Sequence, residues 1–322
     1  MSSLPIPAAA EVHAAAARIE GVARRTPLRH SPALSSIAGG DVWLKLETEQ
    51  ITGSFKLRGA YNALASLDDA ARARGVVASS AGNHGLGVAY AARALGIRAT
   101  IFVPSTAPRV KRDGIAALGA TVDASEPNYD AAMVRARRFA DDTGATFVHP
   151  CLGNPLLAGQ GTVAAEIIDE LPSVATVLVC VGGGGLLGGM AALLRAERPD
   201  VRIIGAQTER TNAMAAALAA GHLVEIPSLP TIADGLAGQI DDDALAIGRY
   251  GLDDIAVLTE DETARAVAWL WNEEHVKAEG SGAVTVGALL SGRVGPVRFP
   301  AVCVVSGANI DDERFNTLVA AD

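Results

Sequence analysis

Short apolar segments with the length of buried strands alternate with longer helical segments along almost the whole chain. The expected strands are 42–47, 75–80, 98–103, 121–123, 146–149, 176–181, 201–207 and 301–305. The expected helices are 54–67, 83–95, about 108–118, 129–143, one from Leu186, 261–274 and 311–320. Parallel strands need a crossover connection such as a helix, and such crossovers are right-handed. The pattern therefore predicts an α/β fold built on parallel sheets.

Size and composition agree with this class. The chain has 322 residues, which suggests two domains or one large α/β domain. Apolar residues make up 49% of the chain and aromatic residues only 4%. This composition favours helices packed on buried parallel strands over an all-β sandwich.

Charge and cysteine content argue against several classes of partner. The formal net charge is −9, and the densest basic group, Arg135, Arg137 and Arg138, shares an expected helix with acidic residues. This is the pattern of a solvated mixed face, so we expect no nucleic-acid partner. We also expect no signal peptide, because the N-terminus lacks a basic segment followed by an apolar one, and we expect no membrane partner. Cys180 and Cys303 lie in apolar strands, so we expect core thiols in a reducing cytoplasm.

The segment 52–60, Thr-Gly-Ser-Phe-Lys-Leu-Arg-Gly-Ala, places Lys56 between a Gly/Ser turn and an apolar helical run. A lone lysine beside a turn is usually a solvated side chain. An amine held there can also do covalent work on a carbonyl compound, and pyridoxal phosphate requires such an amine. Lys45 is the nearest competitor, but it lies in an expected strand, where we predict a structural role.

Four consecutive glycines, Gly182, Gly183, Gly184 and Gly185, follow an expected buried strand and precede Leu186 at the start of a helix. Glycine N–H groups and a helix N-terminus together suit a phosphate. A close strand-to-helix turn is the structural alternative. A dinucleotide site is another, because the loop satisfies G-x-G-x-x-G, but a glutamine stands where that motif expects an acidic residue after the next strand.

Two further segments lie at turns that follow strands. Ser80, Ala81, Asn83 and His84 belong to a strand-to-helix turn, and Ser306 ends the last apolar strand before Gly-Ala-Asn. The structural alternative for His84 is a hydrogen-bonded residue at a helix N-terminus. For Ser306 it is a capping serine.

In this order, the four segments resemble those of the threonine/serine dehydratases. These ammonia-lyases belong to the tryptophan-synthase-β-like (fold type II) pyridoxal-phosphate enzymes and are related to serine racemase. The resemblance covers nearly the whole chain. It implies two open parallel-sheet domains with the cofactor in the cleft between them. The large domain would comprise residues 1–48 and 149–322, and the small domain residues 49–148. We expect a cytoplasmic homodimer.

The resemblance implies a role for each segment. Lys56 matches the family's Schiff-base lysine, which also takes the proton from the substrate Cα, and Phe55 is expected beside the cofactor. Asn83 is expected to hydrogen-bond the cofactor 3′-oxygen, and Ser306 to face the pyridine nitrogen. The four glycines with Leu186 are expected to cradle the 5′-phosphate. The residues expected to hold the substrate are Ser80, Ala81, Asn83 and His84.

Several positions depart from the family's pattern. The family commonly has Gln at Leu86, Phe at Cys151 and Pro at Gly280. Cys151 borders the expected substrate pocket, so a different β-substituent is possible. Ala81 stands where serine racemases carry a second serine as the acid/base on the opposite face. An alanine cannot move a proton, so we expect weak racemisation.

The carboxylates that hold a divalent cation in those racemases are also missing. The matching positions are Gln207, Thr211 and Ala213, so we expect no metal, although Glu209 is nearby. Hydroxyaspartate-specific relatives need a cation for the second carboxylate, and the matching position near Ala132 argues against that substrate. The segment that begins at Glu209 is similar to dehydratases of the hydroxyectoine-degradation branch, so that branch stays open.

We therefore expect a pyridoxal-phosphate ammonia-lyase that converts an L-β-hydroxy amino acid, such as threonine or serine, to a 2-oxo acid and ammonia. Serine racemase stays open as an alternative. β-Replacement, as in cysteine synthases, is a further enzyme hypothesis, but the context of Lys56 is more similar to the dehydratases. The non-enzyme alternatives are a nucleotide-binding module that uses the glycine loop and a catalytically silent α/β binding module.

Overall fold

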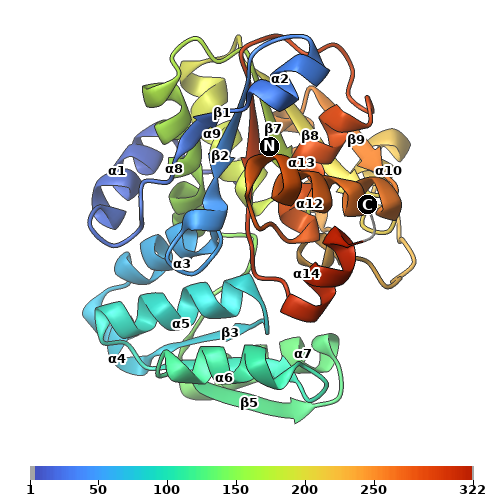
Figure 1. The fold of residues 1–322 in the computed structure, drawn as a ribbon. Coiled ribbons are helices and arrows are strands. Elements are labelled where there is room, and N and C mark those ends of the chain that lie inside the picture. The colour runs from blue at the N-terminus through green and yellow to red at the C-terminus, as the bar shows by residue number, and fades with distance from the viewer. Residues whose placement is uncertain (1–3, 321–322) are drawn as a thin grey trace.

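The computed structural model describes residues 4–320 and contains two sheets (Figure 1). In spatial order, the larger sheet consists of β1 (Leu28–His30), β2 (Val42–Leu46), β10 (Ala301–Val305), β7 (Thr176–Cys180), β8 (Arg202–Thr208) and β9 (Asp254–Leu258). The smaller sheet consists of β5 (Thr121–Glu126), β4 (Ala99–Pro104), β3 (Val76–Ser79) and β6 (Thr146–Phe147). Neighbouring strands are parallel except β1, which pairs with β2 in the antiparallel sense. The expected α/β class with two parallel sheets is confirmed.

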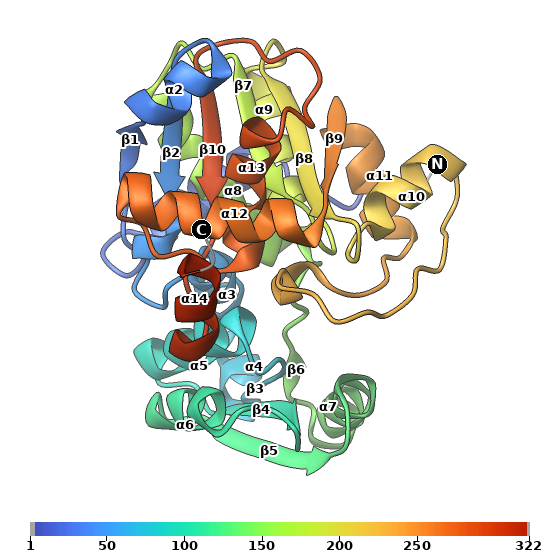
Figure 2. The ribbon, with the colours of Figure 1, turned by 45° about the vertical axis from the view of Figure 1, so that its right-hand side comes forward.

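Helices cover both faces of the larger sheet, as Figure 2 shows. One face carries α1 (Ala9–Ile19), α8 (Asn154–Glu170) and α9 (Gly185–Glu197). The other face carries α2 (Pro32–Ala38), α12 (Glu260–Glu274) and α13 (Gly280–Leu290), with α14 (Asp312–Val319) packed on α12. At the β9 edge lie α10 (Ala213–Ala220) and α11 (Asp242–Gly251).

The smaller sheet has helices of its own and is joined to the larger part by a continuous apolar core. Its helices are α3 (Lys56–Ala65), α4 (Asp69–Arg74), α5 (Asn83–Leu95), α6 (Arg109–Ala117) and α7 (Tyr129–Thr143). Helix α3 packs against α5 on one side and against α8 of the larger part on the other. Two short 3₁₀ turns, η1 (Glu47–Glu49) and η2 (Asp234–Leu236), complete the connections. The N-terminus of α3 therefore lies where the two parts meet.

Burial explains which elements the sequence pattern reveals. Every residue of β7 and β10 is buried, because helices cover both faces of the central strands. Helix α13 is also buried along most of its length, and its sequence, Gly-Ser-Gly-Ala-Val-Thr-Val-Gly-Ala-Leu-Leu, has no polar face. A sequence without a polar face gives no helical period, so α13 was not predicted, and neither was α8.

The predicted elements are present, with ends that differ by a few residues. Helices α5 and α7 have the predicted bounds, whereas β6 ends at Phe147 and β5 extends to Glu126. Helix α12 begins one residue early, because the Thr259 hydroxyl accepts the Glu262 N–H and the Glu262 carboxylate accepts the Thr259 N–H. Within residues 4–320 we find no helix that combines the length and apolarity of a membrane span.

Candidate active site

Lys56 is the first residue of α3, at the junction of the two parts. The segment before it lies along the end of β10. The Phe55 N–H donates to the Ser306 carbonyl (3.2 Å), and the Ala308 N–H donates to the Gly53 carbonyl (2.9 Å). Gly53 has a φ of +71°, which glycine adopts without strain, and this turn directs the chain from η1 into α3. Two segments that are distant in sequence are thereby placed side by side.

The Lys56 amine is half-buried and has one hydrogen-bond partner among the described residues. Its Nζ donates to the Pro150 carbonyl oxygen at 2.9 Å. His149 shapes that segment, because its Nδ1 accepts from the N–H groups of Cys151 (3.2 Å) and Leu152 (3.0 Å). Burial lowers the pKa of His149 to about 4, so the ring is neutral and able to accept. The amine is therefore held by a neutral acceptor rather than locked in an ion pair.

The loop between β7 and α9 presents unused N–H groups. None of the N–H groups of residues 182–187 donates a hydrogen bond within the described part of the chain. Cys151 lies against this loop: a Cβ added to Gly183 would lie 2.7 Å from its Sγ, and one added to Gly185 would lie 3.0 Å from its Cα. Gly184 has a φ of +82° and caps α9. The loop is thus closely packed and presents free N–H groups at a helix N-terminus, an arrangement that suits an anion.

The start of α5 provides a second set of free N–H groups. Those of residues 83–85 have no acceptor within residues 4–320. The turn that leads into them is shaped by Ser80, whose Oγ accepts from the Gly82 N–H at 3.2 Å, and Ala81 is half-buried within that turn. Free N–H groups at a helix N-terminus complement a carboxylate as well as a phosphate.

The His84 side chain has a structural contact. It is buried, and its Nε2 lies 3.0 Å from the Val148 carbonyl oxygen. Burial and the charge of Lys56 lower the pKa of His84 to about 3, so the ring is neutral. The hydrogen must then be on Nε2 for this bond to form, which leaves Nδ1 as an acceptor without a partner in the described part of the chain. The group that His84 offers to an anion is its backbone N–H.

Asn83 is hydrogen-bonded at both ends of its amide. Its Nδ2 donates to Glu279 Oε1 at 2.7 Å, and its Oδ1 accepts from Asn309 Nδ2 at 2.6 Å. Asn309 also donates to the Thr52 carbonyl oxygen at 2.8 Å. Sequence reasoning gave Glu279 no role. The available signal was an isolated acidic residue in an otherwise small and apolar segment.

Buried hydroxyl groups without partners surround the same junction. Ser54 Oγ and Ser281 Oγ are buried and make no hydrogen bond with any residue between 4 and 320. Ser306 Oγ is 3.4 Å from the Ser281 carbonyl oxygen, which is long for an O–H···O bond. Unsatisfied buried hydroxyls are costly, so their grouping beside Lys56 indicates a polar ligand. Pyridoxal phosphate fits this arrangement: an amine for its aldehyde, a glycine loop for its phosphate and a hydroxyl for its ring nitrogen.

Comparison with known proteins agrees with this geometry. The family described as pyridoxal-phosphate dependent enzyme matches residues 19–307. The chain belongs to this family. An L-threonine ammonia-lyase of Thermotoga maritima is 41% identical over 94% of this chain and 75% of its own length. A catabolic L-threonine dehydratase of Staphylococcus aureus is 38% identical over 96% of this chain and 91% of its own length. The structure of maize serine racemase is similar with a TM-score of 0.92 and 31% identity, over 97% of this chain and 96% of that one.

In this pyridoxal-phosphate dependent enzyme, the junction brings together Lys56, Phe55, the glycine loop with Leu186, Asn83 and Ser306. The fold also accounts for one departure from the family pattern. A Cβ on Gly280 would lie 2.2 Å from the Ile232 carbonyl oxygen, so this position has no room for a side chain.

The residues considered above in connection with a cation are engaged in contacts within the protein. Gln207 is buried, and its Nε2 donates to the carbonyl oxygens of Val181 (2.9 Å) and Thr211 (2.8 Å). Glu209 Oε1 accepts the Glu260 N–H at 3.3 Å. Ala132 lies in the apolar cluster of the smaller part. Within residues 4–320, no group of three or more His, Cys, Asp or Glu side chains could hold a metal ion.

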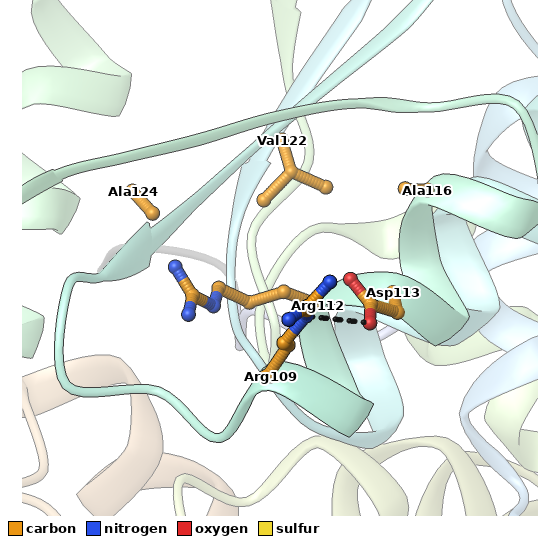
Figure 3. A pocket seen from close by; sticks show the side chains of 6 residues that line it. All are labelled: Arg109, Arg112, Asp113, Ala116, Val122 and Ala124. Atoms are coloured by element: carbon orange, nitrogen blue, oxygen red, sulfur yellow. Dashed lines mark ion pairs between the residues drawn. The ribbon is translucent and has the colours of Figure 1, made fainter.

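A surface hollow on the smaller part lies apart from these residues. Figure 3 shows it between α6 and β5, with the Arg109 and Asp113 side chains paired at 3.4 Å. The residues that line it are Arg109, Arg112, Asp113, Ala116, Val122 and Ala124. None of them is a candidate active-site residue, so this hollow is not the site described above.

Proposed function

We propose that this enzyme removes water from an L-β-hydroxy amino acid, such as threonine or serine, and yields a 2-oxo acid and ammonia. The observation that supports it best is the convergence of the Lys56 amine and two sets of free N–H groups, at α9 and α5, on one junction. Two separate anion sites suit a phosphate and a substrate carboxylate at the same time. The relatives with 38–41% identity that bear the names of threonine ammonia-lyase and dehydratase favour this reaction.

Each part of the site has a role in this proposal. Bound pyridoxal phosphate supplies a carbonyl carbon that links to amines and a conjugated ring that withdraws electrons from Cα. Lys56 holds the cofactor and, once its amine is free, takes the proton from the substrate Cα. The glycine loop binds the phosphate, and residues 80–84 orient the substrate carboxylate. Ser306 offers the ring nitrogen a neutral hydroxyl rather than a carboxylate. The β-hydroxyl leaves as water, and hydrolysis of the product returns one water and releases ammonia.

Racemisation is the second candidate, because maize serine racemase has a similar structure. It requires a proton donor on the face of Cα opposite to Lys56. Ala81 offers only a methyl group at the position that matches the second serine of serine racemases. Elimination is therefore the reaction that the residues support better.

The division of the chain and its context in the cell are part of the same proposal. Residues 49–148 contain the whole smaller sheet, which supports a small domain with these bounds, and 1–48 with 149–322 would form the large domain. The cofactor would lie in the cleft between them. Free thiols at Cys151, Cys180 and Cys303 are consistent with a reducing cytoplasm. A homodimer stays a prediction from the family resemblance.

The test is a substrate panel with the cofactor-loaded protein. L-Threonine, L-serine, 3-hydroxyaspartate and 3-phenylserine are assayed for 2-oxo acid and ammonia. Lys56→Ala should lower turnover by several orders of magnitude and remove the visible absorbance of bound cofactor. Lys277→Ala, a matched loss of a lysine that pairs with Asp312 on the surface, should leave both unchanged. Near wild-type ammonia release by Lys56→Ala would refute the proposal.

A further inference from the structure

We propose that Glu279 and Asn309 are positioning residues that fix the amide of Asn83, so that its nitrogen presents a free N–H to the cofactor's 3′-oxygen. This inference rests on the proposed function, in which Asn83 contacts that oxygen. It concerns residues that touch Asn83 and act through it.

The polarity of this network follows from one fixed acceptor. The Thr52 carbonyl oxygen can only accept, so the side-chain atom of Asn309 at 2.8 Å from it must be the amide nitrogen. The second N–H of that nitrogen donates to Asn83 Oδ1 at 2.6 Å. The opposite atom of the Asn83 amide is then Nδ2, which donates one N–H to Glu279 Oε1 at 2.7 Å. One N–H of Asn83 remains for a ligand.

The network also joins the two parts of the molecule. Asn83 begins α5 beside the smaller sheet, whereas Glu279 immediately precedes α13 and Asn309 follows β10 in the larger part. Glu279 is held in place by its own backbone, whose N–H donates to the Gly307 carbonyl at 3.0 Å. A Cβ on Gly307 would lie 2.8 Å from Glu279 Oε1 and 3.3 Å from Asn83 Nδ2. The contact between the parts is therefore closely packed around the amide.

The charges around Glu279 make this contact sensitive to pH. Burial and the charge of Asp234 from η2 raise the pKa of Glu279, whereas the hydrogen bond from Asn83 and the charges of Lys111 from α6 and Lys56 from α3 lower it. The net result is a pKa of about 8. At neutral pH the carboxyl is protonated and its carbonyl oxygen accepts from Asn83. Above about pH 8 Glu279 would carry a negative charge next to the amide that binds the cofactor's electron-rich 3′-oxygen, which should weaken cofactor binding.

Cofactor titration tests the inference without relying on turnover. Protein freed of cofactor is titrated with pyridoxal phosphate between pH 7 and 9, followed by tryptophan fluorescence and by the visible absorption band. Glu279→Ala and Asn309→Ala should each weaken cofactor binding about tenfold and shift the visible absorption band, because the cofactor's 3′-oxygen loses an oriented donor. Glu279→Gln retains an acceptor, so its affinity at pH 7 should stay within about threefold of wild type and its pH dependence should flatten.

Glu274→Gln is the matched control. The Glu274 side chain is also largely shielded from solvent and ends α12, five residues before Glu279, but it pairs with Arg29 at 3.0 Å instead of facing Asn83. The pyridoxal-phosphate affinity and the visible absorption band of Glu274→Gln should match those of wild type. Wild-type binding and band position in Glu279→Ala and Asn309→Ala would overturn the inference, as would equal losses in Glu279→Gln and Glu279→Ala. If Glu279→Ala does not fold, Glu279→Gln and Asn309→Ala test the inference in its place. Failure of the proposed function can be told apart from failure of this inference, because in that case the wild-type enzyme would release no ammonia from any hydroxy amino acid.

Discussion

Replacing Arg58 by methionine should destabilise the protein strongly, because Arg58 neutralises two carboxylates under the active site. Its guanidinium is fully buried on α3, two residues after Lys56. Nε and Nη2 each donate to Glu47 at 2.8 Å, and Nη1 and Nη2 donate to Glu166 at 2.6 and 2.9 Å. Lys45 Nζ lies 2.6 Å from Glu166, so two cations balance two anions.

The magnitude follows from what the substitution leaves behind. In Arg58→Met, the fully buried Glu47 loses its cation, whereas Glu166, whose side chain is 13% exposed, keeps its contact with Lys45. Removing one partner of a buried pair costs about 3–5 kcal/mol. At roughly 2 °C per kcal/mol, the unfolding midpoint should fall by about 6–10 °C. Arg58→Lys keeps the charge but loses the bidentate bonds, so its loss should be smaller.

The sign of the pH dependence is also fixed. Burial would raise the pKa of Glu166, but the hydrogen bonds and charges of Arg58 and Lys45 lower it below the usual 4.5. A carboxyl with a lowered pKa contributes stability that is present above its unfolded pKa and is lost as the pH falls through the folded value. The difference between wild type and Arg58→Met should therefore be largest near pH 7 and should shrink towards pH 4.

The assay is chemical and thermal unfolding of wild type, Arg58→Met and the double variant Glu47→Gln/Arg58→Met. The double variant removes the uncompensated carboxylate, so it should recover about 1–3 kcal/mol relative to Arg58→Met. A loss below about 1 kcal/mol in Arg58→Met, or no recovery in the double variant, would show that the cluster does not stabilise the fold through charge balance.

Two further substitutions test the site. Gly184→Asp should weaken pyridoxal-phosphate binding at least tenfold, because the new carboxylate would repel the phosphate. The positive φ of +82° at this position adds about 1–2 kcal/mol of backbone strain. Unchanged affinity in a cofactor titration would place the phosphate elsewhere. Ala81→Ser should raise the D-serine formed from L-serine modestly, because a hydroxyl would stand where the wild type has a methyl group. Chiral chromatography measures this, and abundant D-serine from wild type would favour the racemase candidate.

The sequence by itself determined the features that depend on neighbouring residues. Alternating apolar strands and helices predicted the parallel sheets, because side-chain period and glycine turns are local signals. The same holds for Lys56 after its Gly/Ser turn and for the four glycines before α9, where backbone conformation and helix polarity set the chemistry.

Only the tertiary structure decided which groups meet. The Asn83 amide binds Glu279 and Asn309, which lie 196 and 226 residues away in the sequence, and neither pairing leaves a local pattern. Helix α13 was missed because both sides of it are buried, and β1 because a three-residue antiparallel edge strand carries no period. Burial, hydrogen-bond partners and pKa values depend on distances through space, and packing sets those distances only when the whole chain has folded.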